Sequence, residues 1–568
     1  MTSPVSSRPS DCAWGAFDDV APWVLDPNNI SWEKQAIELR VSAQREVPVL
    51  TTPTRIPPVA RLVVVVWVLS KALVPWFVKK KLRPFATPED SRAYISLRMR
   101  KAVERLGSTY IKLGQIISSG EGLFPAELVN EFKLCRDQVP AIPFESVKKT
   151  IESELGKPLT EVFSYIDTTA LAAASIAQVH LASLITGEEV VVKVQRPTVS
   201  KMVRKDLRVM AWLAPHLVGR IKVSALANPP ALVELFAETI VEELDFRIEA
   251  SNMLDVAKML SELNQDRYII PRPHPTLATQ RVLVMQRLSG FKFDDVVGMK
   301  NAGIDTHSVI RTGMIAFMEG AMIYGVFHGD LHGGNLFVMP DGRTALLDFG
   351  IVGRLSGARR MAFLRLMLNA TTNNVVGQVE ALRDLGALPM DTDIHAVIKD
   401  LNLGDAAIDP TTLSGEELVQ EVQRIVKALM GYGARMPKEL MLYVKNMVFL
   451  DGAIARLAPE LDILAEIASI SMLFAERHGE RLGRELGVDH TAIEINLDSV
   501  KTGVLGVDAS VNSLTYRDLR LRALREHPQA FTSDWEDASQ RPLEESRQRL
   551  ASSGVAFWGA FDESGALC

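Results

Sequence analysis

The spacing of apolar residues predicts helices on both sides of a central region that is rich in strands. Four stretches have helical spacing with turn signals between them: residues 91–106, 110–119, 125–134 and 144–155. After about residue 161, two runs of strand-forming residues flank Thr186 and Gly187, which is typical of a β-hairpin. Further helices are expected within 201–260, 305–324 and 357–485, and a further strand within 281–290.

The N-terminal part contains a second kind of pattern. The first 57 residues are rich in Pro, Ser and Asp, so we expect them to be mostly extended, with a short helix near residues 32–43. An apolar stretch follows at residues 62–78, but Ser70, Lys71 and Pro75 interrupt it, so we expect it to be too short and too broken to span a membrane.

Basic residues flank this apolar stretch: Arg61, Lys79, Lys80, Lys81 and Arg83. Each would contribute about 1 kcal/mol at an anionic surface. Aromatic and basic residues beside an apolar band are typical of a helix that lies in a membrane interface on the cytoplasmic side. A helix buried against the body of the protein is equally consistent with the pattern.

The composition is that of a folded protein with several domains. The chain has 568 residues, 47% of them hydrophobic, which is enough to form sizeable cores. The net charge of −6 excludes a global basic field, so we expect no nucleic-acid partner. Cys12, Cys135 and Cys568 form no CxxC pair, which suits a reducing compartment. No basic region followed by an apolar run opens the sequence, so we expect a cytoplasmic protein without a cleaved secretion signal.

Three segments carry the residues that phosphoryl transfer requires. Lys193 lies in the strand-like VVVKV, and Asp348 lies in LLDFG. Between them, HGDLHGGN contains Asp330 and, five positions later, Asn335. The order and the Asp-to-Asn spacing match the protein-kinase signature, in which the lysine holds phosphates, the first Asp orients the nucleophile, and the Asn and the DFG Asp hold magnesium. The sequence therefore predicts an ATP site with Mg²⁺, in which Lys193 and Asp330 are catalytic and Asn335 and Asp348 bind the metal.

The loop around Asp330 also permits a different interpretation, because His328, Asp330 and His332 alternate in it. Alternate residues of a loop can chelate a metal ion, but a zinc site needs three or four ligands, and the sequence offers no partner cluster. We therefore expect His328 to pack beneath the loop.

Further motifs extend the match beyond the kinase set. They are KxGQ (Lys112, Gly114 and Gln115), an alanine-rich loop (Ala172, Ala173, Ala174 and Ser175) and ExD (Glu243 and Asp245). With these motifs, the sequence resembles the UbiB/AarF family of atypical protein-kinase-like proteins, whose eukaryotic members support coenzyme Q synthesis. The match covers about residues 110–352 and continues more weakly to about 475. The resemblance implies an α+β, two-lobed protein-kinase-like fold with an N-terminal helical KxGQ extension and a helical C-terminal lobe.

The resemblance also implies roles within a nucleotide site. Glu249 would pair with Lys193, as a helix glutamate does in kinases. The alanine-rich loop would replace the glycine-rich phosphate loop and hold the nucleotide in a different geometry, because alanine restricts the backbone. In the family, this loop is linked to altered nucleotide preference and suppressed kinase activity. Backbone groups of Gln286 and Leu288 would contact the adenine ring, with Met285 behind it.

A regulatory contact is implied as well. Lys112 and Gln115 would face Glu243 and Asp245, so that the KxGQ segment packs over the place where a kinase admits a peptide. Phosphorylation of other proteins is therefore not expected. An ordinary solvated helix face is the alternative interpretation of the acidic stretch.

These patterns divide the chain into an extended, partly disordered segment (1–57), an interface segment (58–87), the KxGQ extension (88–160), a kinase-like N-lobe with a helical insertion and hinge (161–300), a helical C-lobe (301–485) and a polar tail (486–568). The pentapeptide WGAFD occurs at residues 14–18 and 558–562, and the sequence gives it no role. We expect a peripheral protein at the inner face of a membrane that binds Mg-ATP or ADP and hydrolyses ATP, with quinone-pathway lipids or enzymes as partners. The alternatives are a phosphotransferase for a small molecule or lipid, and a nucleotide-gated scaffold without catalysis.

Overall fold

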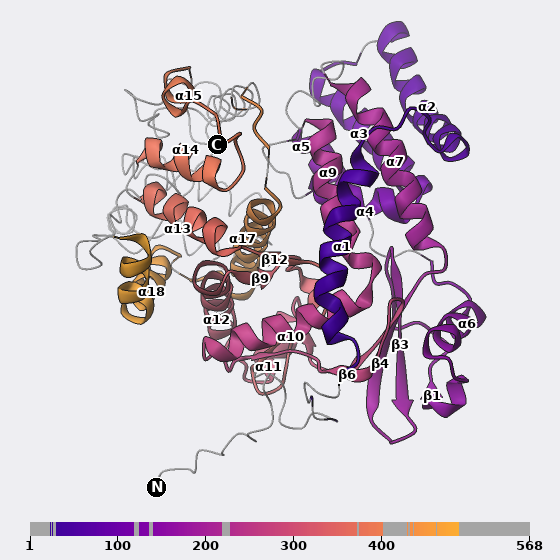
Figure 1. Ribbon diagram of the computed structural model, residues 1–568, viewed down its shortest axis with the longest axis vertical. Coiled ribbons are helices and arrows are strands. Elements are labelled where there is room, and N and C mark those ends of the chain that lie inside the picture. The colour runs from indigo at the N-terminus through magenta and orange to yellow at the C-terminus, as the bar shows by residue number, and fades with distance from the viewer. Residues whose placement is uncertain are drawn as a thin grey trace, which may run out of the picture. The chain divides into compact units, whose positions relative to one another are not determined.

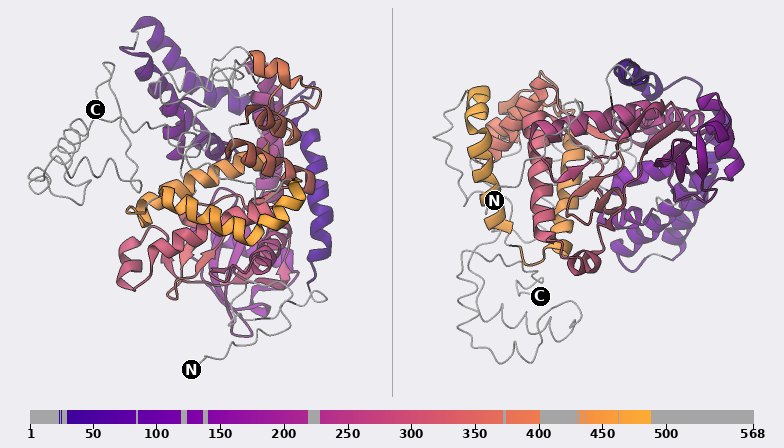
Figure 2. Two further views of the ribbon diagram at one scale, coloured as in Figure 1. Left: turned by 90° about the vertical axis from the view of Figure 1, so that its left-hand side faces the viewer. Right: turned by 90° about the horizontal axis from the view of Figure 1, so that it is seen from below.

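The computed structural model describes residues 23–487, except residues 24, 26–29, 84, 119–123, 136–139, 219–227, 372–373, 401–428, 430–431, 436 and 462. These residues are the coloured ribbons of Figure 1 and Figure 2. They belong to two compact units, Met1–Ser356 with Arg435–Ala458, and Gly357–Ala434 with Pro459–Cys568. Every candidate site residue lies in the first unit. Both copies of WGAFD and the chain after residue 487 lie outside the described residues.

The first unit contains a six-stranded sheet. Its strands are β1 (Phe163–Ile166), β2 (Ala172–Ala173), β3 (Ala177–Leu184), β4 (Glu189–Gln195), β6 (Pro273–Ala278) and β7 (Val282–Gln286). Five of them pair in the order β1-β3-β4-β7-β6, β2 pairs with β3, and every pair is antiparallel. The predicted hairpin is confirmed as β3 and β4, and Gly187 in its turn has a φ of 100°, which glycine adopts without strain.

Alternation along β4 determines where Lys193 points. Val190, Val192 and Val194 are fully buried in a core that they share with α6 (Phe144–Leu155). Because neighbouring strand residues point to opposite faces, Lys193 lies on the other face, where it reaches α10 (Phe246–Glu262). The same run of valines therefore anchors the strand and aims its lysine.

An N-terminal helix, α1 (Glu33–Thr51), fixes α10 in place. One nitrogen of Arg40, Nη2, donates to Ser251, Asn252 and Asp255 of α10 at 2.8–2.9 Å. Before this helix, the indole of Trp32 donates to the carbonyl of His274 on β6 at 3.2 Å. The expected short helix near 32–43 is therefore wrong in length, because α1 has 19 residues and packs on the folded core.

Helices that precede the sheet in sequence and helices that lie between β4 and β6 share another apolar core. Besides α1, they are α2 (Val59–Leu82), α3 (Pro88–Leu106), α4 (Ser108–Ser118), α5 (Ala126–Lys133), α7 (Val199–Leu217) and α9 (Pro229–Ile240). The helices predicted at 91–106, 110–119, 125–134 and 144–155 are confirmed as α3, α4, α5 and α6. The region 201–260 is helical as predicted, but it is divided among α7, α9 and α10.

The apolar stretch before residue 83 forms one continuous helix, α2, across the positions that interrupt the sequence pattern. Pro75 has no N–H to donate to the carbonyl of Lys71 one turn earlier. The Arg98 guanidinium of α3 supplies donors instead: Nη2 donates to the Lys71 carbonyl at 2.6 Å, and Nε to the Ala72 carbonyl at 2.8 Å. The expectation of a short and broken segment is therefore wrong, since α2 has 24 residues.

Replacing Arg98 with Met should lower the free energy of unfolding by about 1.5–3 kcal/mol, the usual worth of hydrogen bonds from a charged donor. Urea denaturation of the parent and the variant measures this. The substitution Pro75→Ala is the matched test, because alanine donates its own N–H to the Lys71 carbonyl. Arg98→Met should therefore cost less in the Pro75→Ala background, and an equal cost in both backgrounds would contradict this role of Arg98.

The two faces of α2 have different surroundings. Val65, Val68 and Ala72 are buried against the helical core, whereas the opposite side exposes valines and aromatic residues. By length and composition alone, α2 could cross a membrane. The prediction that Arg61 is part of a basic surface beside this helix is wrong. Its guanidinium binds the buried Asp206 carboxylate of α7 at 2.5 and 3.1 Å and so docks α2 on the core.

The rest of the first unit carries the predicted catalytic loops. A four-stranded sheet has the order β5-β11-β10-β8, from β5 (Tyr268–Ile269), β11 (Thr344–Leu346), β10 (Leu336–Val338) and β8 (Phe291–Lys292). A second pair joins β9 (Val326–His328) to β12 (Val352–Arg354). The helices here are α11 (Val296–Asn301), α12 (Thr306–Glu319), which continues into a π-helical turn (Gly320–Tyr324), and α17 (Lys438–Leu457). Figure 1 shows α17 beside β9 and β12.

Most of the described residues of the second unit are helical, as predicted for 357–485. They form α13 (Gly357–Thr371), α14 (Val375–Asp384), α15 (Ile394–Asp400) and α18 (Ile463–Leu486). Short 3₁₀ turns also occur in the first unit at Leu159–Glu161, Glu242–Leu244 and Gly333–Asn335.

Candidate functional site

Lys193 joins two carboxylates that come from distant parts of the chain. Its Nζ donates to Glu249 Oε1 at 2.6 Å and to Asp348 Oδ2 at 3.0 Å. The side chain of Glu249 is only 4% exposed, whereas that of Asp348 is 43% exposed. The predicted pairing of Lys193 with Glu249 is confirmed. The lysine therefore has one buried structural partner and one partner that a ligand can reach.

Two side chains of α10 hold the backbone of the segment that follows Asp348. Phe349 is completely buried, its N–H lies 3.5 Å from Glu249 Oε1, and its carbonyl accepts from Asn252 Nδ2 at 2.9 Å. The N–H of Gly350 donates to Asp348 Oδ1 at 2.9 Å. These contacts fix the Asp348 carboxylate relative to the helix that carries Glu249.

His328 packs beneath the loop that carries Asp330, as predicted. Its Nδ1 accepts from the N–H of Asp330 at 3.1 Å, and its Nε2 bonds to the carbonyl of Asp348. Burial lowers the pKa of His328, which favours the neutral ring that these two bonds require. Because both ring nitrogens are engaged, His328 joins the two loops and is not poised to bind zinc.

Gly329 is required at this point because a side chain would not fit. A Cβ atom there would lie 2.7 Å from the Ile351 side chain and 3.0 Å from the Ile351 carbonyl. Because the backbone at position 329 packs closely against Ile351, the residue immediately before Asp330 must be glycine.

Asn335 lies at the same end of the β10–β11 hairpin as Asp348. Its backbone carbonyl accepts from the N–H of Leu347 at 3.0 Å, which pairs the residue just before β10 with the residue just after β11. Its side-chain Nδ2 donates to the Asp330 carbonyl at 3.0 Å, which leaves the amide oxygen as the atom that could bind a cation.

The KxGQ segment reaches this site through Lys112 of α4. Lys112 Nζ lies 3.1 Å from Glu243 Oε1 and 3.9 Å from Asp330 Oδ2. The predicted contact between Lys112 and Glu243 is confirmed. Gln115 lies one turn further along α4.

Asp245 differs from the expectation, because its partner is a neighbour in sequence. Its carboxylate accepts from the backbone N–H of Arg247 at 3.1 Å and from the Arg247 guanidinium at 2.7 and 2.9 Å. Asp245 is thus the N-cap of α10, a position that acidic residues favour because they satisfy free N–H groups. It orients the helix that carries Glu249 instead of facing Lys112.

Two residues of α17 complete the site, and the sequence motifs did not predict them. Lys445 Nζ bonds to Asp330 Oδ1. Asn446 is fully buried, accepts from the N–H of Leu331 at 3.0 Å and donates to the His328 carbonyl. The signal in the sequence is a polar pair inside the apolar run LMLYVKNMVFL, which cannot by itself identify a partner more than a hundred residues away.

The assembled site contains three lysines and four carboxylates: Lys112, Lys193 and Lys445 with Glu243, Glu249, Asp330 and Asp348. Against the effect of burial, the Lys445 and Lys112 ammonium groups hold the pKa of Asp330 far below its ordinary value. Against burial as well, Lys193 and the N–H of Gly350 lower the pKa of Asp348 to about 2. Burial raises the pKa of Glu249 to about 7, although Lys193 opposes the rise. The two aspartates that would act on a nucleotide are therefore ionised.

The alanine-rich segment pairs with β3, the first strand of the hairpin whose second strand carries Lys193. Ala172 and Ala173 form β2, and the N–H of Ala174 donates to the Ala177 carbonyl at 2.8 Å. The Arg196 Nε atom donates to the Ala174 carbonyl at 2.9 Å, and Ser175 is buried. This loop is therefore paired backbone rather than an open glycine-type loop.

The expected adenine contacts lie at the end of β7. Met285 and Gln286 are buried, and Leu288 is half-buried. The N–H of Gln286 donates to the Arg272 carbonyl at 2.8 Å, so a nucleotide contact by Gln286 would have to use its carbonyl.

The donor set near Asp348 fits a hard cation of the magnesium type. Among the described residues, no group of three or more His, Cys, Asp and Glu could hold a metal ion alone. One carboxylate and one amide oxygen, from Asp348 and Asn335, are what Mg²⁺ uses when phosphate oxygens and water complete its shell. The residues thus fit a metal that arrives with a nucleotide.

Comparison with known proteins relates this site to one family. The ABC1 atypical kinase-like domain matches residues 134–382. An uncharacterized chloroplastic aarF domain-containing protein kinase of Arabidopsis thaliana is 32% identical over 402 residues, which cover 65% of this chain and 73% of that protein. A probable protein kinase UbiB of Pseudomonas putida is 30% identical over 405 residues, with 70% and 73% covered. The matched domain contains Lys193, Asp330 and Asp348, whereas Lys112 and Lys445 lie outside it.

Proposed function

We propose, from the premise that this chain belongs to the ABC1/AarF family of atypical kinase-like proteins, that it binds ATP with Mg²⁺ at Lys193 and Asp348 and cleaves the terminal phosphate. The observation that carries the proposal is the bridge from Lys193 to Glu249 and Asp348. Phosphoryl transfer needs a fixed cation for the phosphates beside a fixed carboxylate for the metal, and this bridge holds both.

Each residue of the site has a task in this reaction. Lys193 binds the α- and β-phosphates, and Glu249 keeps its ammonium group in place. Asn335 and Asp348 hold Mg²⁺, which neutralises charge on the phosphate oxygens when it is bound. Asp330 orients the attacking water or hydroxyl. Because two lysines stabilise its ionised form, Asp330 is a weak proton acceptor, which suits a reaction with a loose transition state and little need for a base.

We assign two lobes to the first unit. The six-stranded sheet with α10 is the smaller lobe, and α11, α12 and α17 with the loops around Asp330 and Asp348 form the larger. ATP would bind where Lys193 of the first lobe meets Asp348 of the second. Lys112 lies against Asp330 and restrains the approach of a bulky acceptor, so water or a small molecule is the acceptor that we favour over a protein.

The same proposal places the protein at the inner, cytoplasmic face of a membrane, where it acts in isoprenoid-quinone or lipid metabolism. The support is α2, whose outward side exposes Val63, Trp67, Val74 and Phe77. Its other side is docked on the core, so we favour a helix that lies in the interface over one that spans the bilayer. Lys79, Lys80 and Lys81 at its end add attraction to anionic lipid.

Turnover of ATP by the purified chain tests this function. Phosphate release is measured with Mg²⁺, in the presence and absence of anionic vesicles and of phenols that resemble quinone precursors. We expect Mg²⁺-dependent release that rises with vesicles. A phosphorylated phenol or lipid would instead identify a phosphotransferase, and tight nucleotide binding without turnover in any condition would identify a scaffold and contradict the proposal.

Lys445 should control the pH dependence of this turnover. A cation favours the ionised carboxylate, so Lys445→Gln should raise the pKa of Asp330, and the acidic limb of the turnover profile should move to higher pH. Turnover measured between about pH 4 and about pH 8 tests this, because the parent should show no acidic limb from Asp330 in this range, whereas Lys445→Gln should lose activity at its acidic end. Lys438→Gln is the matched control, because Lys438 lies on the same helix but pairs with Glu242. An acidic limb that stays in place in Lys445→Gln would show that Lys445 does not act on Asp330.

A further inference from the structure

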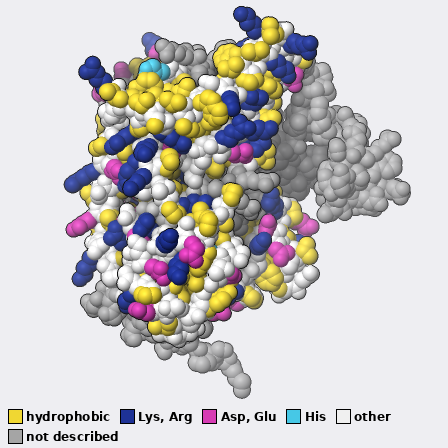
Figure 3. Space-filling model, turned by 90° about the vertical axis from the view of Figure 1, so that its right-hand side faces the viewer, with side chains coloured by type: hydrophobic (Ala, Val, Ile, Leu, Met, Phe, Trp, Pro, Cys, Tyr) yellow, Lys and Arg dark blue, Asp and Glu magenta, His cyan; other side chains and the backbone are white. Residues whose placement is uncertain are grey.

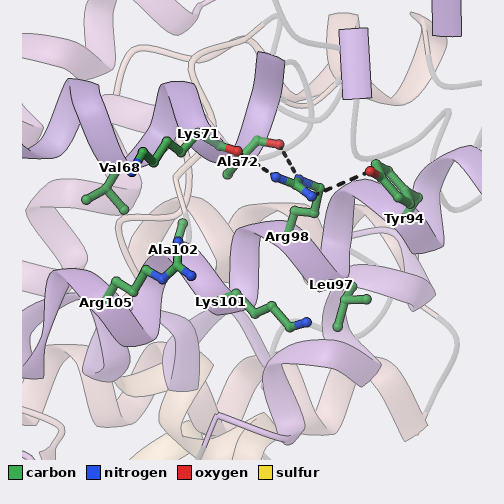
Figure 4. A pocket seen from close by; sticks show the side chains of 9 residues that line it. All are labelled: Val68, Lys71, Ala72, Tyr94, Leu97, Arg98, Lys101, Ala102 and Arg105. Atoms are coloured by element: carbon green, nitrogen blue, oxygen red, sulfur yellow. Dashed lines mark hydrogen bonds between the residues drawn. The ribbon is translucent and has the colours of Figure 1, made fainter. Parts of the chain in front are cut away.

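A hollow of about 240 Å³ lies between α2 and α3, away from the nucleotide site. Four of the nine residues that line it are basic, Lys71, Arg98, Lys101 and Arg105, and none is acidic. Figure 4 shows Lys71 on one helix, Lys101 and Arg105 on the other, and Arg98 between them. A concave site with cations on both walls is suited to an anion.

The cations of this hollow are not equally available. Arg98 donates to two carbonyls of α2, so its guanidinium is engaged within the protein. Lys71 lies over the ring of Trp67, 3.7 Å from its centroid. Lys101 and Arg105 are exposed one turn apart, and within the described ranges no carboxylate lies within 4.0 Å of either basic group. Two like charges at this spacing repel each other unless an anion is present.

The hollow adjoins an exposed apolar surface. On α2, Trp67, Val74 and Val78 are about half exposed or more, and Lys71 lies among them in sequence. Figure 3, which faces the right-hand side of Figure 1, shows hydrophobic side chains gathered near the top of the molecule with Lys and Arg side chains beside them. A ligand that matches both features has an anionic head and an apolar tail. A free phosphate would leave the apolar side uncovered, and a nucleic acid would match only the charge.

We propose that this hollow binds the phosphate headgroup of an anionic phospholipid of the membrane, while the exposed side of α2 enters the acyl region. The inference rests on the membrane association proposed above and adds a defined headgroup site to it. Lys101 and Arg105 contact the phosphate, and Lys71 lies at the boundary between the headgroup and the acyl chains.

Chemical protection of Lys101 tests the site in the unaltered, full-length chain. Reductive methylation of lysines is followed by mass spectrometry with vesicles of phosphatidylcholine alone, with equimolar phosphatidylglycerol and phosphatidylcholine, and with inorganic phosphate. We expect the anionic vesicles to slow modification of Lys101 several-fold and to leave Lys149, an exposed lysine of α6, unchanged. Equal protection by inorganic phosphate would show an anion site without lipid specificity and would overturn the proposal, as would an unprotected Lys101 on vesicle-bound protein.

A pair of charge-matched variants gives the second arm. Lys101→Gln with Arg105→Gln removes two cations of the hollow, and Lys149→Gln with Lys157→Gln removes two exposed cations elsewhere. Partition onto the anionic vesicles, measured by sedimentation, should fall roughly fivefold per cation in the first variant and stay near the parent value in the second. Equal losses in both variants would overturn the proposal. The proposal would also be overturned if the variant with Lys101→Gln and Arg105→Gln kept its vesicle binding but lost binding of an RNA oligonucleotide.

The membrane association itself is tested separately by changing Lys79, Lys80 and Lys81 to Glu. If this variant loses vesicle binding while the Lys101 and Arg105 variant binds like the parent, the headgroup site is wrong and the interfacial helix stands. If the parent never binds vesicles, the membrane part of the proposed function fails together with the headgroup site, whereas ATP turnover is unaffected by that result.

Discussion

Replacing Asp348 with Asn should reduce Mg²⁺-dependent ATP turnover by roughly a thousandfold, with no loss of fold. Asn has the same shape as Asp but lacks the charge that holds a metal ion against phosphate oxygens. The variant keeps the contact of Lys193 with Glu249 and the Gly350 N–H close to an acceptor oxygen. Phosphate release measures the effect on turnover, and circular dichroism with thermal melting verifies the fold.

The matched control for this prediction is Asp341→Asn. Asp341 lies in the turn between β10 and β11, is exposed, and pairs with Arg343. The Asp341→Asn variant loses the same charge on the same hairpin without changing the site, so its ATP turnover should equal that of the parent. Full activity in Asp348→Asn would contradict the assignment of Asp348 as a metal ligand.

Replacing Lys193 with Met should have two large effects, one on ATP affinity and one on stability. Affinity should fall roughly tenfold to a hundredfold, because the phosphates lose a charged donor. The free energy of unfolding should fall by about 3–5 kcal/mol above about pH 7, where Glu249 is ionised in the parent, because this carboxylate stays buried without its cation.

The stability loss should depend on pH in a defined direction. In the folded chain, burial holds the pKa of Glu249 above its ordinary 4.5, and removal of Lys193 raises it further. A group whose folded pKa is raised is neutral in both states at low pH, and it destabilises the fold as pH rises above its unfolded pKa. This penalty is the same in both proteins until pH reaches the folded pKa of Glu249 in the parent, about 7. The part of the stability difference that comes from Glu249 should therefore be small below about pH 7 and grow as pH rises above it.

The double substitution Lys193→Met with Glu249→Met separates the two effects. Removing both charges leaves no buried carboxylate, so stability should recover, since apolar pairs replace buried ion pairs at little cost. ATP affinity should stay low because no cation returns. Recovery of ATP binding in the double variant would show that Lys193 does not contact the phosphates.

The site residues that could be predicted from the sequence are those whose signal is local. Asp330, Asn335 and Asp348 lie in short loops at fixed spacing, and Lys193 lies in a strand whose alternation sets its direction. Glu249 required the family resemblance, because the sequence around it is also that of a solvated helix.

The residues that the sequence did not predict depend on partners far along the chain. Lys445 and Asn446 hold the Asp330 loop from a helix that begins more than a hundred residues later. The continuity of α2 across Pro75 depends on Arg98 of the next helix, and Arg61 is withdrawn from the surface by Asp206. The predicted partner of Asp245 is wrong because the ExD motif places this residue at the N-cap of α10, where it accepts from Arg247. In each case a local pattern allowed two outcomes, and tertiary contact selected one.

The most direct test of the central claim is calorimetric titration of ATP into the purified chain, with Mg²⁺ present and after its removal by EDTA. We predict saturable binding of one ATP per chain that weakens strongly when Mg²⁺ is removed. When Asp348 is replaced with Asn, removal of Mg²⁺ should no longer change the affinity for ATP. Absence of saturable binding, or binding that is equally tight with EDTA and in Asp348→Asn, would contradict a magnesium-dependent ATP site at Lys193 and Asp348.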